Sequence, residues 1–192
     1  MTTPNPTAAA TIYVLDSGVS RFTARAFVTG LLASMGHNPT FAIRQVTGEA
    51  KFSNEAPEQA SVRVVVQAGS LELTDQVSDK DRREIERTTR NEVLETSRFA
   101  EIVFEASNPS MSKGGEGHYW ANINGKLTIR GITQPQQISA QVSVTGDQLR
   151  ASGEFTVRQS SFGIKPVSVA GGTLKLKDDV KVTFDFVAKK KE

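Results

Sequence analysis

The chain has no cysteine and only two histidines among its 192 residues. Without cysteine it has no disulfide, no thiol nucleophile and no cysteine-ligated metal. A zinc site would need both histidines together with carboxylates from elsewhere in the sequence. We therefore expect no bound metal and no other cofactor.

The chain also has little net charge and no long apolar run. The net charge is only +2, which is too small to predict a nucleic-acid partner. No apolar run is long enough to span a bilayer, and the first residues lack the basic and apolar regions of a secretory signal. We expect no stable membrane insertion and a cytoplasmic location, or a periplasmic one if a leader has been removed.

The composition and length fit one globular domain. Hydrophobic residues make up 38% of the chain and charged residues 23%, as in soluble proteins that bury a core. We expect a flexible N-terminal tail at residues 1–11, a single domain at 12–188 and a basic tail at 189–192.

Apolar and polar residues alternate with a period of two along most of the predicted domain. One face of the first run is apolar and the other is polar, with Phe22, Ala24 and Ala26 opposite Arg21, Thr23 and Arg25. The last run repeats the pattern with Val180, Val182, Phe184 and Phe186. Gly146-Asp147 separates two further runs as in a short hairpin. This pattern predicts antiparallel strands with one buried face.

A single segment breaks the alternation, and it predicts one helix near residues 79–96. Ile85, Thr89 and Val93 follow one another at four-residue spacing, and Ser78 with Asp81 resembles a capping box. The narrow apolar stripe suits a helix that covers an opening. About eight strands and one inserted helix predict an all-β fold, either an antiparallel barrel or a sandwich. Many small residues on the predicted inner faces would leave room inside a barrel.

His37 lies in the stretch "LLASMGHNP" and has several interpretations. A catalytic base requires a nucleophile and an orienting partner, and the sequence offers no such constellation. Contact with a ligand head group is the functional alternative. The structural alternative is that His37 is an ordinary loop residue beside the Asn38-Pro39 turn.

Two ordered motifs carry a resemblance to a known family. "LTIRGIT" (127–133) is similar to the "G-x-L-T-I-x-G-V-T-x-P" segment of the YceI-like, or polyisoprenoid-binding, family. Arg158 followed by Phe162-Gly163-Ile164 resembles its "R-x-x-D-F-G-I" segment, with Ser161 where the family commonly has Asp. The resemblance implies an eight-stranded lipocalin-like barrel with a helical cover, an elongated apolar cavity that holds a lipid tail, and no catalytic residues.

The leading hypothesis is thus a non-enzymatic protein that binds, transports or stores a long-chain isoprenoid or similar amphiphilic lipid. The ligand would be a polyprenyl compound, an isoprenoid quinone or a fatty-acyl amphiphile. The predicted cavity residues are Phe22, Phe41, Ile43, Val64, Phe104, Trp120, Phe155, Phe162 and Phe184. The predicted head-group residues are Arg158, Ser161, Lys165 and His37.

Alternatives remain open at this point. Trp120 and Phe162 fit a core equally well, and Arg158 fits an exposed or internally paired strand residue. The competing function is a structural or interaction module with a filled core, which could form a homodimer through an edge strand or the helix. A hydrolase or isomerase would need two titratable groups with widely separated pKa values.

Overall fold

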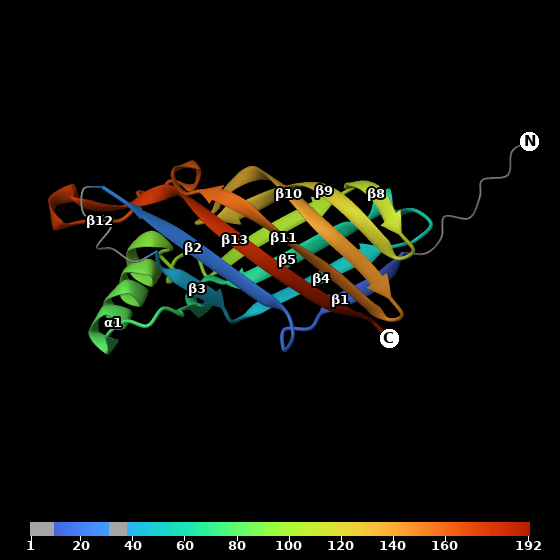
Figure 1. Cartoon of the computed structure of the whole chain (residues 1–192), viewed down its shortest axis with the longest axis horizontal. Helices are drawn as coiled ribbons and strands as arrows, with labels where there is room; N and C mark the ends of the chain where they lie inside the picture. Colours follow the sequence, from blue (N-terminus) through green and yellow to red (C-terminus); the bar gives the residue numbers. More distant parts are fainter. Residues whose placement is uncertain (1–9, 31–37) are drawn as a thin grey trace, which may run out of the picture.

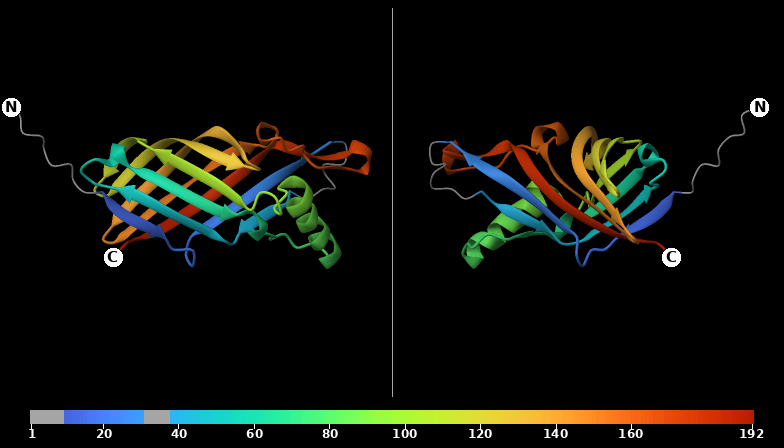
Figure 2. Two further views of the ribbon diagram at one scale, coloured as in Figure 1. Left: turned by 180° about the vertical axis from the view of Figure 1, so that it is seen from behind. Right: turned by 45° about the vertical axis from the view of Figure 1, so that its right-hand side comes forward.

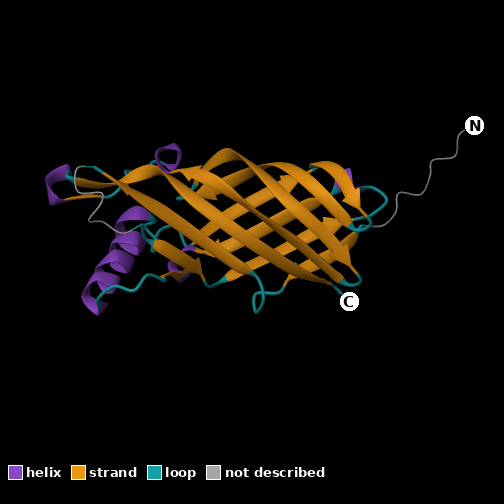
Figure 3. Cartoon of the chain, in the orientation of Figure 1, coloured by secondary structure: helices purple, strands orange, loops and turns teal. Residues whose placement is uncertain are grey.

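Antiparallel strands form along almost the whole chain, as the computed structural model shows for residues 10–30 and 38–192 (Figure 1 and Figure 3). The strands are β1 (Thr11–Leu15), β2 (Arg21–Thr29), β3 (Thr40–Ile43), β4 (Val46–Phe52), β5 (Ser61–Gln67), β6 (Leu71–Leu73), β7 (Glu101–Ser107), β8 (Ser110–Gly115), β9 (His118–Ile129), β10 (Ile132–Thr145), β11 (Gln148–Arg158), β12 (Ser168–Val169) and β13 (Leu174–Lys190). The helical segments are α1 (Asp79–Thr88), the π-helical turn η4 (Thr89–Val93) and the short 3-10 turns η2 (Pro57–Gln59), η3 (Ala68–Ser70), η5 (Gln159–Phe162) and η6 (Ala170–Gly172).

Eight of these strands close into a barrel. Each strand pairs with its neighbour in the order β1-β4-β5-β7-β9-β10-β11-β13, and β13 returns to β1 through the pairing of Leu15 with Ala188. The predicted turn at Gly146-Asp147 joins β10 to β11, and Gly146 has the positive φ that such a turn needs. The predicted eight-stranded antiparallel barrel with one helix inserted near residues 79–96 is confirmed, with α1 and η4 together covering Asp79 to Val93.

Three strands of the barrel, β1, β4 and β5, are connected by short bends to further strands. Beyond the bends at residues 16–20, 44–45 and 68–70 the chain continues as β2, β3 and β6, which pair in the same order alongside β13. Backbone hydrogen bonds connect the second and third bends, from Arg44 N to Ser70 O at 3.2 Å and from Gln67 N to Gln45 O at 3.0 Å. Past the bends β6 pairs with β3, whereas β7 pairs with β5 and β9, so the sheet is open between β6 and β7.

Helix α1 covers that open edge, as Figure 2 shows. Ser78 caps the helix by accepting a hydrogen bond from Asp81 N at 3.1 Å, as the capping box predicts. Glu86 accepts from Leu73 N on β6 at 3.1 Å, and Arg82 donates to Leu73 O and, at 2.8 Å, to Asp75 O. Side chains of the helix thus replace the missing neighbour strand, because buried backbone groups must find partners.

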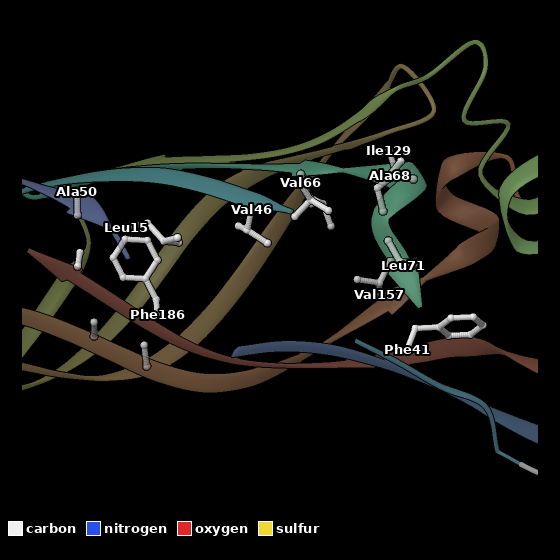
Figure 4. Packing of buried hydrophobic residues seen from close by; sticks show 14 of the residues in the cluster. Leu15, Phe41, Val46, Ala50, Val66, Ala68, Leu71, Ile129, Val157 and Phe186 are labelled. Atoms are coloured by element: carbon white, nitrogen blue, oxygen red, sulfur yellow. The ribbon is translucent and has the colours of Figure 1, made fainter. Parts of the chain in front are cut away.

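The opposite end of the barrel, which contains β1, the β8–β9 turn and the end of β13, is filled with side chains; we call it the closed end. Phe52 and Tyr119 meet edge to face with their ring centroids 5.4 Å apart, and the Tyr119 hydroxyl donates to Asn54 at 3.0 Å. Figure 4 shows Phe186 beside Leu15 in this part of the barrel. These contacts exclude solvent, since Tyr119 is 5% exposed and Phe186 4%.

Strand β13 continues through Lys190, two residues into the segment expected to be a basic tail. Lys189 pairs with Val14 in the sheet, and its ammonium group lies 2.8 Å from a carboxylate oxygen of Asp16. This contact holds the pKa of Asp16 below its usual range. Among the described residues, no helix is both long and apolar enough to cross a bilayer.

Candidate functional site: an apolar cavity inside the barrel

The barrel encloses a cavity of about 920 Å³. This volume lies near the upper end of the range typical of small-molecule sites. The cavity runs from the helix end, where residues of α1 border it, to Phe52 and Met111 toward the closed end. A filled barrel of this size has no such space, so the small inner side chains do leave room, as we expected.

Seven of the nine predicted cavity residues lie on the cavity wall, and they come from six different strands and both halves of the chain. They are Phe22, Phe41, Ile43, Val64, Phe104, Phe155 and Phe184. Most of these side chains are only half-buried although they point inward. Their exposed surface faces the cavity, which is the direct sign of unfilled apolar space within the sheet.

Glycines on the sheet let phenylalanine rings lie against the wall. A Cβ atom on Gly125 would stand 2.4 Å from the Phe104 ring, and one on Gly153 would stand 3.0 Å from the Phe184 ring. Neither glycine has a positive φ, so the requirement is for space and not for backbone freedom. Larger residues at these two positions would push the rings into the cavity.

Two polar side chains on the wall, Gln159 and Thr89, already have partners within the protein. Gln159 is 6% exposed, and its amide donates to Lys177 O at 2.9 Å. The Thr89 hydroxyl donates to Ile85 O at 2.8 Å on the same helix. These groups are therefore not free to select a polar ligand, and the interior recognises mainly apolar surface.

Charged residues border the cavity chiefly at the helix end, which we call the mouth. One stripe of helix α1 and its flanks faces the cavity, with Ser78, Asp81, Glu84, Ile85, Thr88, Thr89 and Val93. The stripe is acidic toward Ser78 and apolar toward Val93. Lys175 of β13 borders the mouth as well. The sequence analysis found the apolar part of this stripe but missed the acidic part, although the same three- and four-residue spacing includes it.

Trp120 was placed wrongly by the sequence analysis. Its neighbours Tyr119 and Ala121 are 5% and 3% exposed and point inward, whereas Trp120 is 58% exposed on the outside of β9. Successive side chains of a strand point to opposite faces, so Trp120 cannot share a face with Tyr119 and Ala121. The alternation of apolar and polar residues along β9 was therefore sufficient to predict that Trp120 points outward.

Phe162 is buried but lies outside the cavity wall. It is 2% exposed at the end of turn η5, where it belongs to the hydrophobic core. Gly163 follows with a φ of 67°, a left-handed conformation that favours glycine. The "Phe-Gly-Ile" segment thus forms a packed turn, and its last residue, Ile164, is the one that borders the cavity.

The predicted head-group residues do not gather at the mouth. Arg158 is exposed on the outer face of β11, with its guanidinium 3.7 Å from Asp179. Ser161 is exposed, and its backbone carbonyl accepts from Gln134 at 3.0 Å. Lys165 is exposed and absent from the cavity wall. His37 lies outside the described residues. For Arg158, the alternative of an exposed, internally paired strand residue describes the structure.

Turn η5 is fixed to β13 by Asp178. The carboxylate accepts from Ser160 N at 2.7 Å and from Ser160 Oγ at 2.5 Å. The hydroxyl bond, together with the backbone bond, lowers the pKa of Asp178 against the opposing effect of burial. Across residues 10–30 and 38–192, no three histidine or carboxylate side chains are grouped so that they could hold a metal ion.

Comparison with known proteins identifies the class to which this cavity-containing barrel belongs. The YceI-like domain matches residues 13–188, and the chain is a member of that family. A UPF0312 protein of Shewanella baltica (strain OS185) is 28% identical over 165 residues, which cover 82% of this chain and 79% of the relative.

Two solved structures show the same fold. BcnA of Burkholderia cenocepacia superposes with a TM-score of 0.69 at 18% identity, covering 91% of this chain and 99% of BcnA. A polyisoprenoid-binding domain from Saccharophagus degradans, implicated in plant cell wall breakdown, superposes with a TM-score of 0.68 at 11% identity, covering 93% of this chain and 98% of the domain.

Proposed function

We propose that this protein binds the long apolar chain of an isoprenoid or similar amphiphilic lipid inside its barrel and carries or stores it without chemical change. The apolar cavity of about 920 Å³ is the observation that carries the proposal. Membership of the YceI-like family and the binding activity named for the Saccharophagus domain support it. The competing hypothesis of a module with a filled core does not account for the cavity.

The length of the cavity sets the size of the ligand. The inner face of β13 borders the cavity from Leu174 to Phe186. Those twelve steps of about 3.4 Å, on a strand tilted by about 40°, span about 30 Å along the barrel axis. An extended hydrocarbon advances about 1.3 Å per carbon, so the cavity accommodates roughly 24 chain carbons.

Burial of such a chain provides enough free energy for tight binding. At about 0.8 kcal/mol per methylene, roughly 24 carbons contribute about 19 kcal/mol. The cost of association is about 4–15 kcal/mol. Affinity therefore needs no strong polar contact, which agrees with wall groups such as Gln159 already being hydrogen-bonded within the protein.

The head group of the ligand lies at the mouth in this proposal. Gln76, Asp81, Glu84 and Lys175 border the cavity there and present both hydrogen-bond donors and acceptors. These residues replace Arg158, Ser161 and Lys165 as the proposed head-group contacts. Polyprenyl alcohols and isoprenoid quinones carry such a hydrogen-bonding head on a long apolar tail.

Native mass spectrometry of protein purified from cells tests the proposal, followed by organic extraction and identification of any released compound. We expect a mass excess that matches one molecule with a long isoprenoid or acyl chain. Protein stripped of ligand should take up one equivalent of an added polyprenyl alcohol. A bare mass together with no uptake of polyprenyl alcohol or fatty acid would overturn the proposal.

A further inference from the structure

Beside the mouth, the outer surface of the barrel carries an excess of positive charge. Arg25 on β2, Lys175 and Lys177 on β13, and Lys165 in the segment that leads into β12 are all exposed. We call these four residues the basic face. Among the described residues, none of the four has a carboxylate within 4.0 Å. Their charges are therefore available to an external partner.

The strand pattern places three of these residues on one wall. Ala24, Ala26 and Val28 of β2 border the cavity, so Arg25 points outward. On β13, Leu174 and Leu176 border the cavity, and Lys177 lies on the outer face. Lys175 is exposed at the rim, where it also borders the mouth. Figure 1 shows β2 and the β12–β13 hairpin extending together past the barrel at the end where α1 lies.

Neighbouring carboxylates do not neutralise the basic face. Asp179 lies 3.7 Å from Arg158, and Glu154 lies 2.7 Å from Lys181, so each of these acids has its own cation. Asp178 accepts two hydrogen bonds from Ser160 that favour its ionised form, so it offsets only one of the four positive charges. The wall formed by β2, β13 and β11 therefore keeps a net positive charge beside the mouth.

An aromatic side chain lies within the basic face. Phe27 follows Ala26 and precedes Val28, both of which border the cavity, so its ring is on the outer face and half-buried. The Arg25 guanidinium is 5.6 Å from the centre of that ring. Aromatic rings next to lysine and arginine are typical of surfaces that contact the headgroup region of a bilayer.

The opposite rim of the mouth has no such excess of positive charge, because helix α1 carries four acidic and four basic residues. Asp81 and Glu84 of helix α1 border the cavity there. An anionic surface would attract the β2–β13 wall more strongly than the helix, whose charges cancel. The asymmetry fixes one orientation, with the basic face against the surface and the mouth next to it.

We propose that the basic face docks the protein on an anionic lipid bilayer, so that the mouth of the cavity lies beside the headgroups. This inference goes beyond the proposed function, because docking is measured without any ligand in the barrel. Each lysine or arginine near an anionic membrane raises partitioning by about fivefold. The attraction is screened at high salt. Docking of this kind is peripheral and involves no segment that spans the membrane.

Vesicle flotation with the full chain tests the proposal. We expect the protein to float with vesicles of phosphatidylcholine mixed with phosphatidylglycerol, and to stay behind with phosphatidylcholine alone. Replacing Arg25, Lys165 and Lys177 by Gln should lower partitioning by about a hundredfold. These three residues do not border the cavity, so uptake of a polyprenyl alcohol from solution should stay unchanged.

A matched triple variant controls for net charge alone. Lys113, Lys126 and Lys190 are exposed, lie on β8, β9 and the far end of β13, and change the charge by the same amount when replaced by Gln. Partitioning should fall far less in this variant. Equal losses in both triple variants, or equal flotation with neutral and anionic vesicles, would overturn the docking proposal. Neither result depends on whether the barrel binds a lipid.

Discussion

Phe184 and Phe186 lie two residues apart on the same face of β13 and both border the cavity, yet Phe184 is half-buried whereas Phe186, at the end of the cavity, is tightly packed. Phe186 is 4% exposed and contacts the region of Gly48 and Leu15 at the closed end. Phe184 is half-buried, with its ring 6.3 Å from that of Phe155. The same alternation builds both ends of the barrel, so the pattern of the strand does not decide which end is hollow.

The difference comes from what surrounds each ring. At the closed end, large side chains such as Tyr119 and Phe52 meet across the barrel axis. Farther along, small residues such as Ala24 line the wall, and Gly153 lets the Phe184 ring lie against the sheet. The closed end therefore supplies folding stability, while the rest of the interior is left for a ligand.

Truncating the two phenylalanines gives the largest expected difference in stability. Phe186→Ala leaves a void among the tightly packed side chains at the end of the cavity and should lower the free energy of unfolding by about 4 kcal/mol. Phe184→Ala enlarges a space that already exists and should cost about half as much or less. Urea denaturation of the ligand-free variants measures both values. Equal losses would contradict the division into a filled and a hollow part.

Filling the hollow part should abolish most of the binding. Ala24→Trp projects an indole into the cavity and displaces about four chain carbons, which weakens binding by about 3 kcal/mol. Thr23→Trp, on the outer face of the same strand, is the matched control and should leave affinity unchanged. Titration with a polyprenyl alcohol measures both, and unfolding curves verify that the variants remain folded. Unchanged affinity of Ala24→Trp would place the ligand elsewhere.

The glycine that supports Phe184 should be sensitive to a single methyl group. Gly153→Ala brings a Cβ atom to 2.4 Å from Ser139 O and 3.0 Å from the Phe184 ring. We expect a loss of about 2 kcal/mol in the free energy of unfolding and weaker binding of bulky tails. Gly115→Ala is the control, because a Cβ atom there meets nothing within 4 Å. Similar effects of the two substitutions would refute the supporting role of Gly153.

Acid should loosen turn η5 at the helix end by a small amount. Folding lowers the pKa of Asp178, so its contribution to stability is present above the ordinary aspartate pKa and is lost as the pH falls through the lower, folded value. The loss should occur below about pH 4 and amount to less than about 1 kcal/mol. Asp178→Asn should remove this part of the pH dependence of unfolding. An unchanged acid slope would mean that the bonds to Ser160 are energetically neutral.

The sequence predicted most of the fold, because apolar alternation is a local signal. The runs that contain Phe22 and Phe184 became strands whose inner residues border the cavity, and Ile85 faces it from the helix. The bends next to β1, β4 and β5 were not predicted. They depend on hydrogen bonds between segments far apart in the chain, such as the bond from Arg44 to Ser70.

The mouth was predicted less well than the wall. Arg158, Ser161 and Lys165 were selected because they flank a motif, but the motif forms a packed turn outside the cavity. The residues that border the mouth, among them Asp81 and Lys175, come from segments that meet only when the barrel closes. The spacing of residues within one helix or strand shows which side chains share a face. Which side chains from different helices and strands come together is known only once the fold is known.

A chain-length series tests the central claim most directly. Binding of polyprenyl alcohols that differ only in tail length should be measured on ligand-free protein. Affinity should rise steeply with each added unit and level off near the roughly 24 chain carbons that fill about 30 Å. An affinity that is independent of tail length would contradict an account in which burial of the chain inside the barrel drives binding.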